Sequence, residues 1–269
     1  MKLYYLKMFG KNFFSKNLYT SLFDRRCYYF YGEVLDMNVT KYTNQVFEQN
    51  VEITAGSPIF ENCVFEKGVR VQGDNKDCFL KGGYPSPVFR SCTFRQSEDY
   101  CVVLWHRAQG AFYDCQMVSK NYCVIRIDSA AHGLFYNCSI NAFQTCGVAI
   151  MIAASGIFEK CCFNFEGDMG SAIYLDACDK EKTRFSKCSF FADGVLTKSC
   201  LCVCGHTAIS FDECNFFYPK EAEFFGKYWR HDHQFNNCRF NRIFNDDSLN
   251  MNNCSFEPDA IKDDFQIGK

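Results

Sequence analysis

A six-residue motif of the form F-x-x-C-x-F recurs along the chain, and it constrains the fold more strongly than any other feature. Nine segments carry the motif or a close variant: FENCVF (60–65), FRSCTF (89–94), FYDCQM (112–117), FYNCSI (135–140), FEKCCF (158–163), FSKCSF (185–190), FDECNF (211–216), FNNCRF (235–240) and MNNCSF (251–256). The motif cysteines are Cys63, Cys92, Cys115, Cys138, Cys161, Cys188, Cys214, Cys238 and Cys254. They lie 16 to 29 residues apart, a spacing typical of stacked repeats that bury apolar faces against their neighbours.

A second apolar run separates many of the motifs. The runs are CVVLW (101–105), CVIRI (123–127), VAIMI (148–152), SAIYL (171–175) and CLCVC (200–204). They are short and rich in β-branched residues, and none has the length or the 3.6-residue period of a helix. Each repeat is therefore predicted to be strand, turn, strand, turn.

The motif itself should contain a corner. Alternation along a strand puts the Cys and the aromatic residue two positions later on one face, so the Phe three positions before the Cys must belong to another segment. Asn precedes the Cys in four of the nine motifs, at Asn62, Asn137, Asn237 and Asn253. Asn tolerates a left-handed backbone better than most residues, which indicates a left-handed bend at this point.

The repeats resemble those of right-handed parallel β-helices of the pectate-lyase-like superfamily, and more closely the F-x-x-[NC]-x-F repeats of polymorphic outer-membrane-type proteins. The resemblance implies an all-β, right-handed parallel β-helix of about nine turns. We expect a non-repeat N-terminal cap or arm at residues 1–45, the β-helix at 46–256 and a C-terminal tail at 257–269. The chain departs from the outer-membrane type because we find no secretory signal, no translocating C-terminal barrel and no G-G-A-I runs. This architecture carries lyases, hydrolases, adhesins and inert scaffolds, so the motif does not select a function.

A leucine-rich repeat is the competing solenoid, because its repeat has a similar length and also uses Asn or Cys at a fixed position. Its second half-repeat is normally helical or irregular. The second run of this chain is β-branched, which favours the β-helix.

Composition and charge narrow the classes of partner. The formal net charge is −2, which gives no general attraction to phosphate backbones, so we expect no nucleic-acid partner. No apolar stretch approaches the roughly 20 residues that would span a bilayer. Nineteen cysteines cannot all pair within one chain, and they follow the repeat, so we expect mostly free, buried thiols in a reducing, cytoplasmic compartment. Cys162, next to Cys161, should face the opposite side of its strand.

A catalytic site on a β-helix would use outward-facing strand positions. If Cys101, Cys123 and Cys202 point inward, one outward column holds Leu104, Arg126, Met151, Tyr174 and Val203, and the next holds His106, Asp128, Ala153, Asp176 and Gly205. Asp128 and Asp176 would lie two turns apart, about 10 Å, with Arg126 and His106 nearby. That separation is near the upper limit for the carboxylates of an inverting glycosidase. Ordinary solvent-facing charges at strand ends explain these residues better.

Two groups of residues suggest a metal site. Cys200, Cys202 and Cys204 alternate ahead of His206, but alternate residues of a strand lie about 6.7 Å apart, too far for three sulfurs to bind one ion. His231 and His233 alternate in a loop without an evident third ligand. We therefore predict no metal and no cofactor.

The expected function is that of a non-catalytic structural or protein-interaction scaffold. The apolar members of the first outward column, Leu104, Met151, Tyr174 and Val203, together with Trp229, are the predicted contact residues, because water should not face such a column alone. The basic, aromatic arm of residues 1–45 would cap the first turn or contact a neighbour. We extend the expectation to a larger intracellular assembly, cytoskeletal or ciliary and bound to microtubules. The alternative is a carbohydrate-active lyase or hydrolase.

Overall fold

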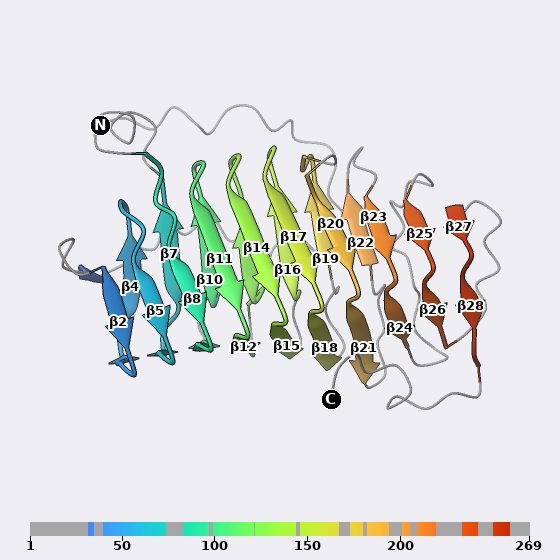
Figure 1. Ribbon diagram of the computed structural model, residues 1–269, viewed down its shortest axis with the longest axis horizontal. Coiled ribbons are helices and arrows are strands. Elements are labelled where there is room, and N and C mark those ends of the chain that lie inside the picture. The colour runs from blue at the N-terminus through green and yellow to red at the C-terminus, as the bar shows by residue number, and fades with distance from the viewer. Residues whose placement is uncertain are drawn as a thin grey trace, which may run out of the picture. The chain divides into compact units, whose positions relative to one another are not determined.

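Parallel strands joined by turns form the described structure, which is a computed structural model (Figure 1). The structure describes residues 32–34, 40–73, 83–96, 99–120, 122–143, 146–166, 173–179, 182–193, 201–204, 209–218, 233–241 and 250–258. The strands all belong to one unit, residues 31–269, and they form three parallel sheets. No helix in the described part of the chain has the length and apolar character needed to cross a bilayer.

Each of the first eight coils gives one strand to each sheet, and the last two coils give described strands to sheets B and C alone. Figure 1 shows this succession for the front of the stack. Sheet A contains β1 (Gly32–Val34), β4 (Asn50–Ile53), β7 (Val69–Gln72), β10 (Val102–Trp105), β13 (Ile125–Ile127), β16 (Val148–Met151), β19 (Ile173–Asp176) and β22 (Leu201–Cys204). Sheet B contains β2 (Lys41–Thr43), β5 (Ile59–Glu61), β8 (Val88–Arg90), β11 (Gln109–Tyr113), β14 (His132–Tyr136), β17 (Ser155–Glu159), β20 (Arg184–Ser186), β23 (Ser210–Asp212), β25 (Gln234–Asn236) and β27 (Asn250–Asn252). Sheet C contains β3 (Val46–Phe47), β6 (Val64–Phe65), β9 (Thr93–Gln96), β12 (Gln116–Ser119), β15 (Ser139–Phe143), β18 (Cys162–Glu166), β21 (Ser189–Asp193), β24 (Asn215–Phe217), β26 (Arg239–Phe240) and β28 (Ser255–Phe256).

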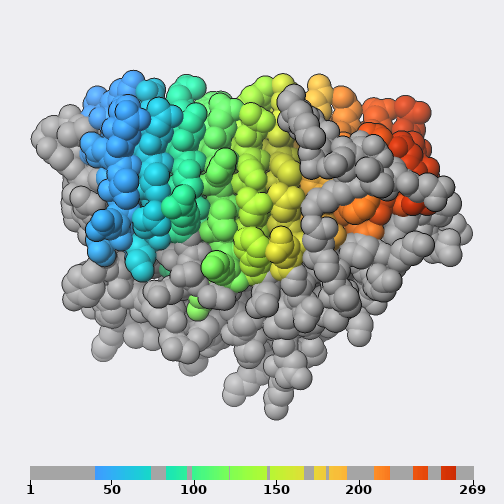
Figure 2. All heavy atoms as spheres, turned by 90° about the horizontal axis from the view of Figure 1, so that it is seen from below, coloured from blue at the N-terminus to red at the C-terminus, as the bar shows by residue number. Residues whose placement is uncertain are grey.

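The predicted all-β parallel β-helix is therefore confirmed. The second apolar run of the repeat forms sheet A, a parallel sheet of strands, which excludes the leucine-rich alternative with its helical half-repeat. Successive coils lie side by side as coloured bands in the space-filling view (Figure 2).

The corner between sheets B and C has the same geometry in every coil. Two residues separate the strands there, and the first has a positive φ between 51° and 55° in all ten coils. These ten residues are Asn44, Asn62, Ser91, Asp114, Asn137, Lys160, Lys187, Glu213, Asn237 and Asn253. The predicted left-handed bend is confirmed, although only five of the ten are the Asn that best tolerates it.

The pairing begins earlier than the repeat detected in the sequence. Tyr42 pairs with Phe60, so the segment YTNQVF (42–47) is a diverged motif in which Tyr replaces Phe and Gln45 replaces Cys. β1 also pairs in parallel with β4. Parallel pairing thus starts ahead of residue 46, the predicted start of the β-helix; residues 1–31 and 35–39 lie outside the described residues.

Two columns of aromatic rings fill the interior. In sheet B the rings stack with centroids 4.6–5.3 Å apart and planes within 20° of parallel, along Tyr42, Phe60, Phe89, Phe112, Phe135, Phe158, Phe185, Phe211 and Phe235. In sheet C a second column contains Phe47, Phe65, Phe94, Phe163, Phe190, Phe216, Phe240 and Phe256, with Met117 and Ile140 in its middle. Such offset ring contacts stabilise a core beyond the area that they bury.

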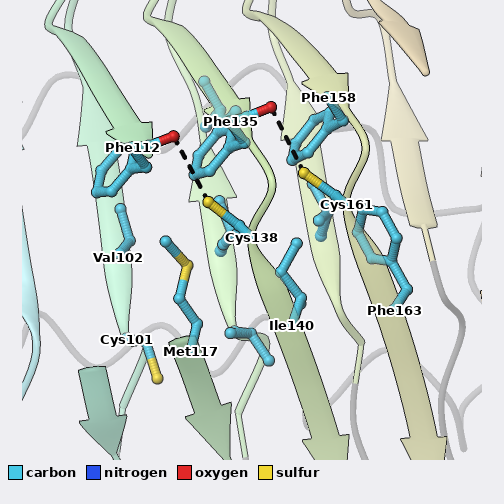
Figure 3. Close-up of a cluster of buried hydrophobic side chains, with 14 of the residues drawn as sticks. Cys101, Val102, Phe112, Met117, Phe135, Cys138, Ile140, Phe158, Cys161 and Phe163 are labelled. Carbon is cyan, nitrogen blue, oxygen red and sulfur yellow. Dashed lines mark hydrogen bonds between the residues drawn. The ribbon is translucent and has the colours of Figure 1, made fainter. Parts of the chain in front are cut away.

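The motif cysteines lie between these columns (Figure 3). Each thiol donates to the carbonyl oxygen of the aromatic residue in the preceding coil, at 3.3–3.7 Å, as Cys138 does to Phe112 and Cys161 to Phe135. The column from Cys63 to Cys238 is at most 2% exposed, and Cys254 is half-buried. Burial raises the pKa of the Cys188 thiol. Cysteine suits the position because it is small and apolar and still offers a weak donor.

Three inward-facing glycines make room for the sheet B rings. Gly110, Gly133 and Gly156 pair with one another in successive coils. A methyl group added to Gly133 would lie 2.6 Å from Cε2 of Phe135 and 2.9 Å from Cδ1 of Ile127. The glycines are therefore required by packing density and not by backbone conformation.

Candidate functional site

The outer face of sheet A carries the polar residues predicted as catalytic candidates. Strand pairing places Val103, Arg126, Ala149 and Tyr174 in one outward column. The next outward column contains Trp105, Asp128, Met151 and Asp176, because each follows its neighbour in the first column by two residues. Arg126 and Asp128 thus lie on one strand end, and Asp176 lies two strands away.

The prediction that Leu104 belongs to an outward apolar column on this face is wrong. Val102 pairs with Ile125, whereas the sequence interpretation aligned Cys101 with Cys123, one position out of register. Cys101 and Val102 are both fully buried in the core, so a corner interrupts the alternation on which that alignment relied. A slip of one residue exchanges the two faces of a strand, and Leu104 consequently lies in the core at 0% exposed.

The other predicted contact residues do not lie together in one outward column. Val203 pairs with Leu175, which is a core residue. Tyr174 stays in the column of Arg126, and Met151 lies in the column of Asp128. Both are only 5% exposed, so neither offers free surface. Trp229 lies outside the described residues.

The carboxylate of Asp128 is held by hydrogen bonds on both oxygens. Arg126 Nη2 donates to Oδ2 at 2.7 Å, and Ser129 Oγ donates to Oδ1 at 3.2 Å. The indole N–H of Trp105 donates to the same Ser129 hydroxyl at 3.0 Å, and Arg126 Nη1 donates to the Tyr100 hydroxyl at 3.3 Å. Asp128 is 3% exposed. A buried carboxylate with this set of donors is an anchored anion.

Asp176 has a different environment. Burial raises its pKa, and the nearby charge of Asp128 raises it further. Met151 lies between the two carboxylates in the column, so they are separated by two strand spacings, about 10 Å. The face therefore offers a carboxylate paired with Arg126 and a second carboxylate, that of Asp176, whose raised pKa means that it binds a proton more readily. His106 lies at the corner after β10 with φ 52°, its ring 4.4 Å from that of Trp105.

The metal candidates do not form a cluster where the chain is described. No group of three ligating side chains occurs among the described residues. His233 is a core residue, 1% exposed, and its Nδ1 accepts the N–H of Ile209 at 3.2 Å. Cys202 and Cys204 are alternate residues of β22, while Cys200, His206 and His231 lie outside the described residues.

Sheet B carries an outward column that the sequence interpretation missed. Ile59, Val88, Ala111, Leu134 and Ile157 pair in succession, and each is partly exposed. We call these five residues the aliphatic stripe. The signal was present, since each is the residue immediately before the motif Phe in five consecutive repeats, and Arg184 ends the series.

Aromatic and cationic side chains border the aliphatic stripe. Tyr113 and Tyr136 lie in the next outward column, their rings 6.4 Å apart. The Arg90 guanidinium lies 4.8 Å from the ring of Tyr113. Lys160 donates to the Tyr136 hydroxyl at 2.6 Å and lies 4.9 Å from its ring. An apolar strip beside tyrosine and cationic groups has the composition of a protein-binding surface.

A separate apolar side chain, that of Ile152, lies at the corner between sheets A and B. Ile152 is 52% exposed and has φ 49°. A β-branched residue in the left-handed region is an outlier. Ile152 thus combines backbone strain with exposed apolar surface.

Comparison with known proteins gives one match. A family model described as "Right handed beta helix region" matches residues 46–174 and, overlapping with this, residues 77–240. The second match alone covers more than half of the chain. No curated protein and no solved structure matches significantly.

Proposed function

The chain belongs to the right-handed β-helix family, and we propose that within this fold it is a non-catalytic scaffold that binds another protein through the outer face of sheet B. The family's architecture does not itself select a function, because it carries enzymes and inert scaffolds alike. The choice between an enzyme and a scaffold therefore depends on which side chains the outer faces of the sheets carry.

The aliphatic stripe is the observation that carries this proposal. Five partly exposed residues in successive strands form an apolar strip of roughly 19 Å, at about 4.8 Å for each strand spacing. Contiguous apolar surface of this kind is typical of contact sites, whereas single exposed apolar residues are not. Tyr113, Tyr136 and Arg90 at its border are of the types that contribute most to protein interfaces.

Ile152 supports the same proposal independently. Its left-handed backbone has a conformational cost, and its side chain faces solvent over half of its area. Strain of this kind persists where something other than folding stability selects the residue. A contact with a partner would supply that selection.

We also propose a cytoplasmic location. The column of buried cysteines supports it, because thiols packed as small apolar groups suit a reducing compartment. Thiol counts in denaturant, taken before and after reduction, should be nearly equal. A large rise on reduction would show disulfides and would argue for an oxidising compartment. The cytoskeletal or ciliary location remains a prediction from the sequence.

The test compares proteins captured from native cells by the full chain and by two variants. Leu134→Asp puts a charge in the centre of the aliphatic stripe, and Gln234→Asp puts the same charge on the same face, in the same column but beyond the stripe. We expect a defined set of proteins to be retained by wild type and by Gln234→Asp, and lost with Leu134→Asp. Equal capture by all three would exclude the stripe as the binding surface. Thermal melting checks that Leu134→Asp is folded.

A carbohydrate-active hydrolase is the second candidate, and the outer face of sheet A favours it. Asp128 forms an ion pair with Arg126, and the raised pKa of Asp176 suits a proton donor. The separation of about 10 Å is near the limit for an inverting pair. Cleavage of any glycan by the purified chain, abolished in Asp128→Asn with Asp176→Asn, would overturn the scaffold proposal.

A further inference from the structure

The spacing of the aliphatic stripe restricts what can bind along it. Its five side chains come from adjacent strands of sheet B, side by side in Figure 1, so they repeat at about 4.8 Å. On one face of an extended peptide side chains repeat at about 6.7 Å, and on a helix at about 5.4 Å. Over the four spacings of the stripe, a peptide therefore drifts by about 7.6 Å and a helix by about 2.4 Å. A second stack of parallel strands has the same repeat and stays in register throughout.

The outward column that borders the stripe is complementary to itself. Glu61, Arg90, Tyr113, Tyr136 and Glu159 pair in succession along this column. Arg90 thus precedes the two tyrosines and Glu159 follows them. A two-fold axis between the tyrosines reverses the column, which puts Arg90 opposite Glu159 and Tyr113 opposite Tyr136. Opposite charges then meet at two symmetric places, with aromatic rings between them.

The same reversal also fits the sizes of the stripe residues. Ala111 and Leu134 are adjacent in the stripe, so an axis between them puts each opposite the other. Val88 and Ile157, the next residues on either side, then also meet. The smallest side chain of the stripe consequently faces a large one, as in interdigitated apolar layers.

Other two-fold arrangements of this face match less well. With the axis at Ala111, the acidic residues Glu61 and Glu159 would lie opposite each other, and like charges in contact are unfavourable. With the axis along the coil stack, the columns on the two sides of the stripe would face each other. Glu159 would then face Ser155, two residues earlier on the same strand, and the charge pairing would be lost.

We propose that two copies of this chain bind each other face to face through the aliphatic stripe, with antiparallel coil stacks and a two-fold axis between β11 and β14. The inference rests on the proposed function, because it names the protein that the stripe binds. The facing strands, β5 to β20, cover roughly 24 Å by 15 Å on each copy. An interface of this size belongs to the weak, reversible class, below about 1,200 Å² in total. The two copies use the same surface, so the assembly closes at two.

Charge-reversed variants of the full chain test the pairing of Arg90 with Glu159. In a dimer of Arg90→Glu two acidic groups would meet at each symmetric place, and in a dimer of Glu159→Arg two basic groups would meet. Each variant alone should therefore dimerise at least about tenfold more weakly than wild type, which is 1.4 kcal/mol. An equimolar mixture of the two variants restores opposite charges at both places and should dimerise about as well as wild type.

Sedimentation at concentrations up to about 100 µM, as a weak interface requires, measures these equilibria. Wild type should show monomer and dimer with no larger species. Gln234→Arg is the matched control, because Gln234 lies on the same face two strands beyond β20, outside the facing strands. It should leave the dimerisation constant unchanged. Melting curves of all variants separate lost association from lost folding.

Three results would overturn the inference: a wild-type chain that stays monomeric, a folded Arg90→Glu variant that dimerises like wild type, or a mixture that dimerises no better than its components. Capture from cells distinguishes this failure from that of the proposed function. If wild type stays monomeric and Leu134→Asp still loses the captured proteins, the stripe binds a different protein and the inference alone fails. If capture is also equal for all variants, both fail.

Discussion

Replacing Gly133 by Ala should destabilise the protein, and the reason lies in the rings around it. In a strand, Ala normally gains about 0.5–1 kcal/mol over Gly from the reduced entropy of the unfolded chain. Here the added methyl group would lie 2.6 Å from Phe135 Cε2 and 2.9 Å from Ile127 Cδ1. Phe135 cannot move aside, because it stacks between Phe112 and Phe158 at 4.7 and 4.6 Å.

The two effects have opposite signs, and their magnitudes decide the outcome. Overpacking in a dense core costs typically about 1–3 kcal/mol, which exceeds the entropic gain. We therefore expect a net loss of about 1–2 kcal/mol, measured as a lower midpoint of denaturant unfolding with an unchanged slope. A neutral or stabilised Gly133→Ala variant would refute the packing argument.

Ile127→Val provides an internal control because it removes Cδ1, one of the three nearest atoms that the new methyl group meets. Alone, this truncation should cost about 0.5–1.5 kcal/mol. In the Gly133→Ala background the cost should be smaller, since the truncation also relieves overlap. Strict additivity of the two changes would show that Ile127 and position 133 do not compete for space.

Three further predictions follow from other positions. Cys138→Ser should lower the free energy of unfolding by about 1–3 kcal/mol because it buries a more polar group in an apolar column. Cys162 is partly exposed on the outer face of β18, so Cys162→Ser should change the free energy of unfolding little, and equal losses for the two variants would contradict the face assignment. Ile152→Asn should raise stability by roughly 0.5–1 kcal/mol, because Asn tolerates positive φ; a lower melting temperature would show that the corner is not strained. For Asp176 the raised pKa means that the folded protein binds the proton more tightly than the unfolded chain does, so the wild-type protein loses stability as the pH rises from about 3.8 through the folded-state pKa. The Asp176→Asn variant should lack this loss, and parallel pH–stability curves for the two proteins would contradict the raised pKa.

The core of the repeat could be predicted from sequence because one motif contains both of its constraints. The two aromatic positions and the Cys mark three inward columns, and the residue directly before the Cys marks the left-handed corner. The diverged motif at Tyr42 escaped detection because Gln45 replaces the cysteine. The pairing register supplies that information, since Tyr42 stacks on Phe60 at 4.9 Å.

The outer faces were harder to predict, for a geometrical reason. Alternation along a strand assigns faces only if the starting residue is known, and Cys101 lies in a corner and not in a strand. Leu104 was therefore placed on the wrong face, while Arg126 and Asp128 were placed correctly because they sit within and just after β13. The aliphatic stripe required comparison of the same position across repeats, which an inspection of each strand by itself does not provide.

The invariant corner between sheets B and C also determines where this protein can change length. Exactly two residues connect the strands there in every coil, whereas the connections from sheet C to sheet A span two to seven residues and those from sheet A to sheet B span three to fifteen. Residues added at the latter two corners leave the stacked rings and thiols in register, and each doubling of such a connection costs only about 0.6 kcal/mol of closure entropy. The fold can therefore acquire new surface segments, by evolution or by grafting, at two of its three corners, while the third keeps every coil in phase with the next.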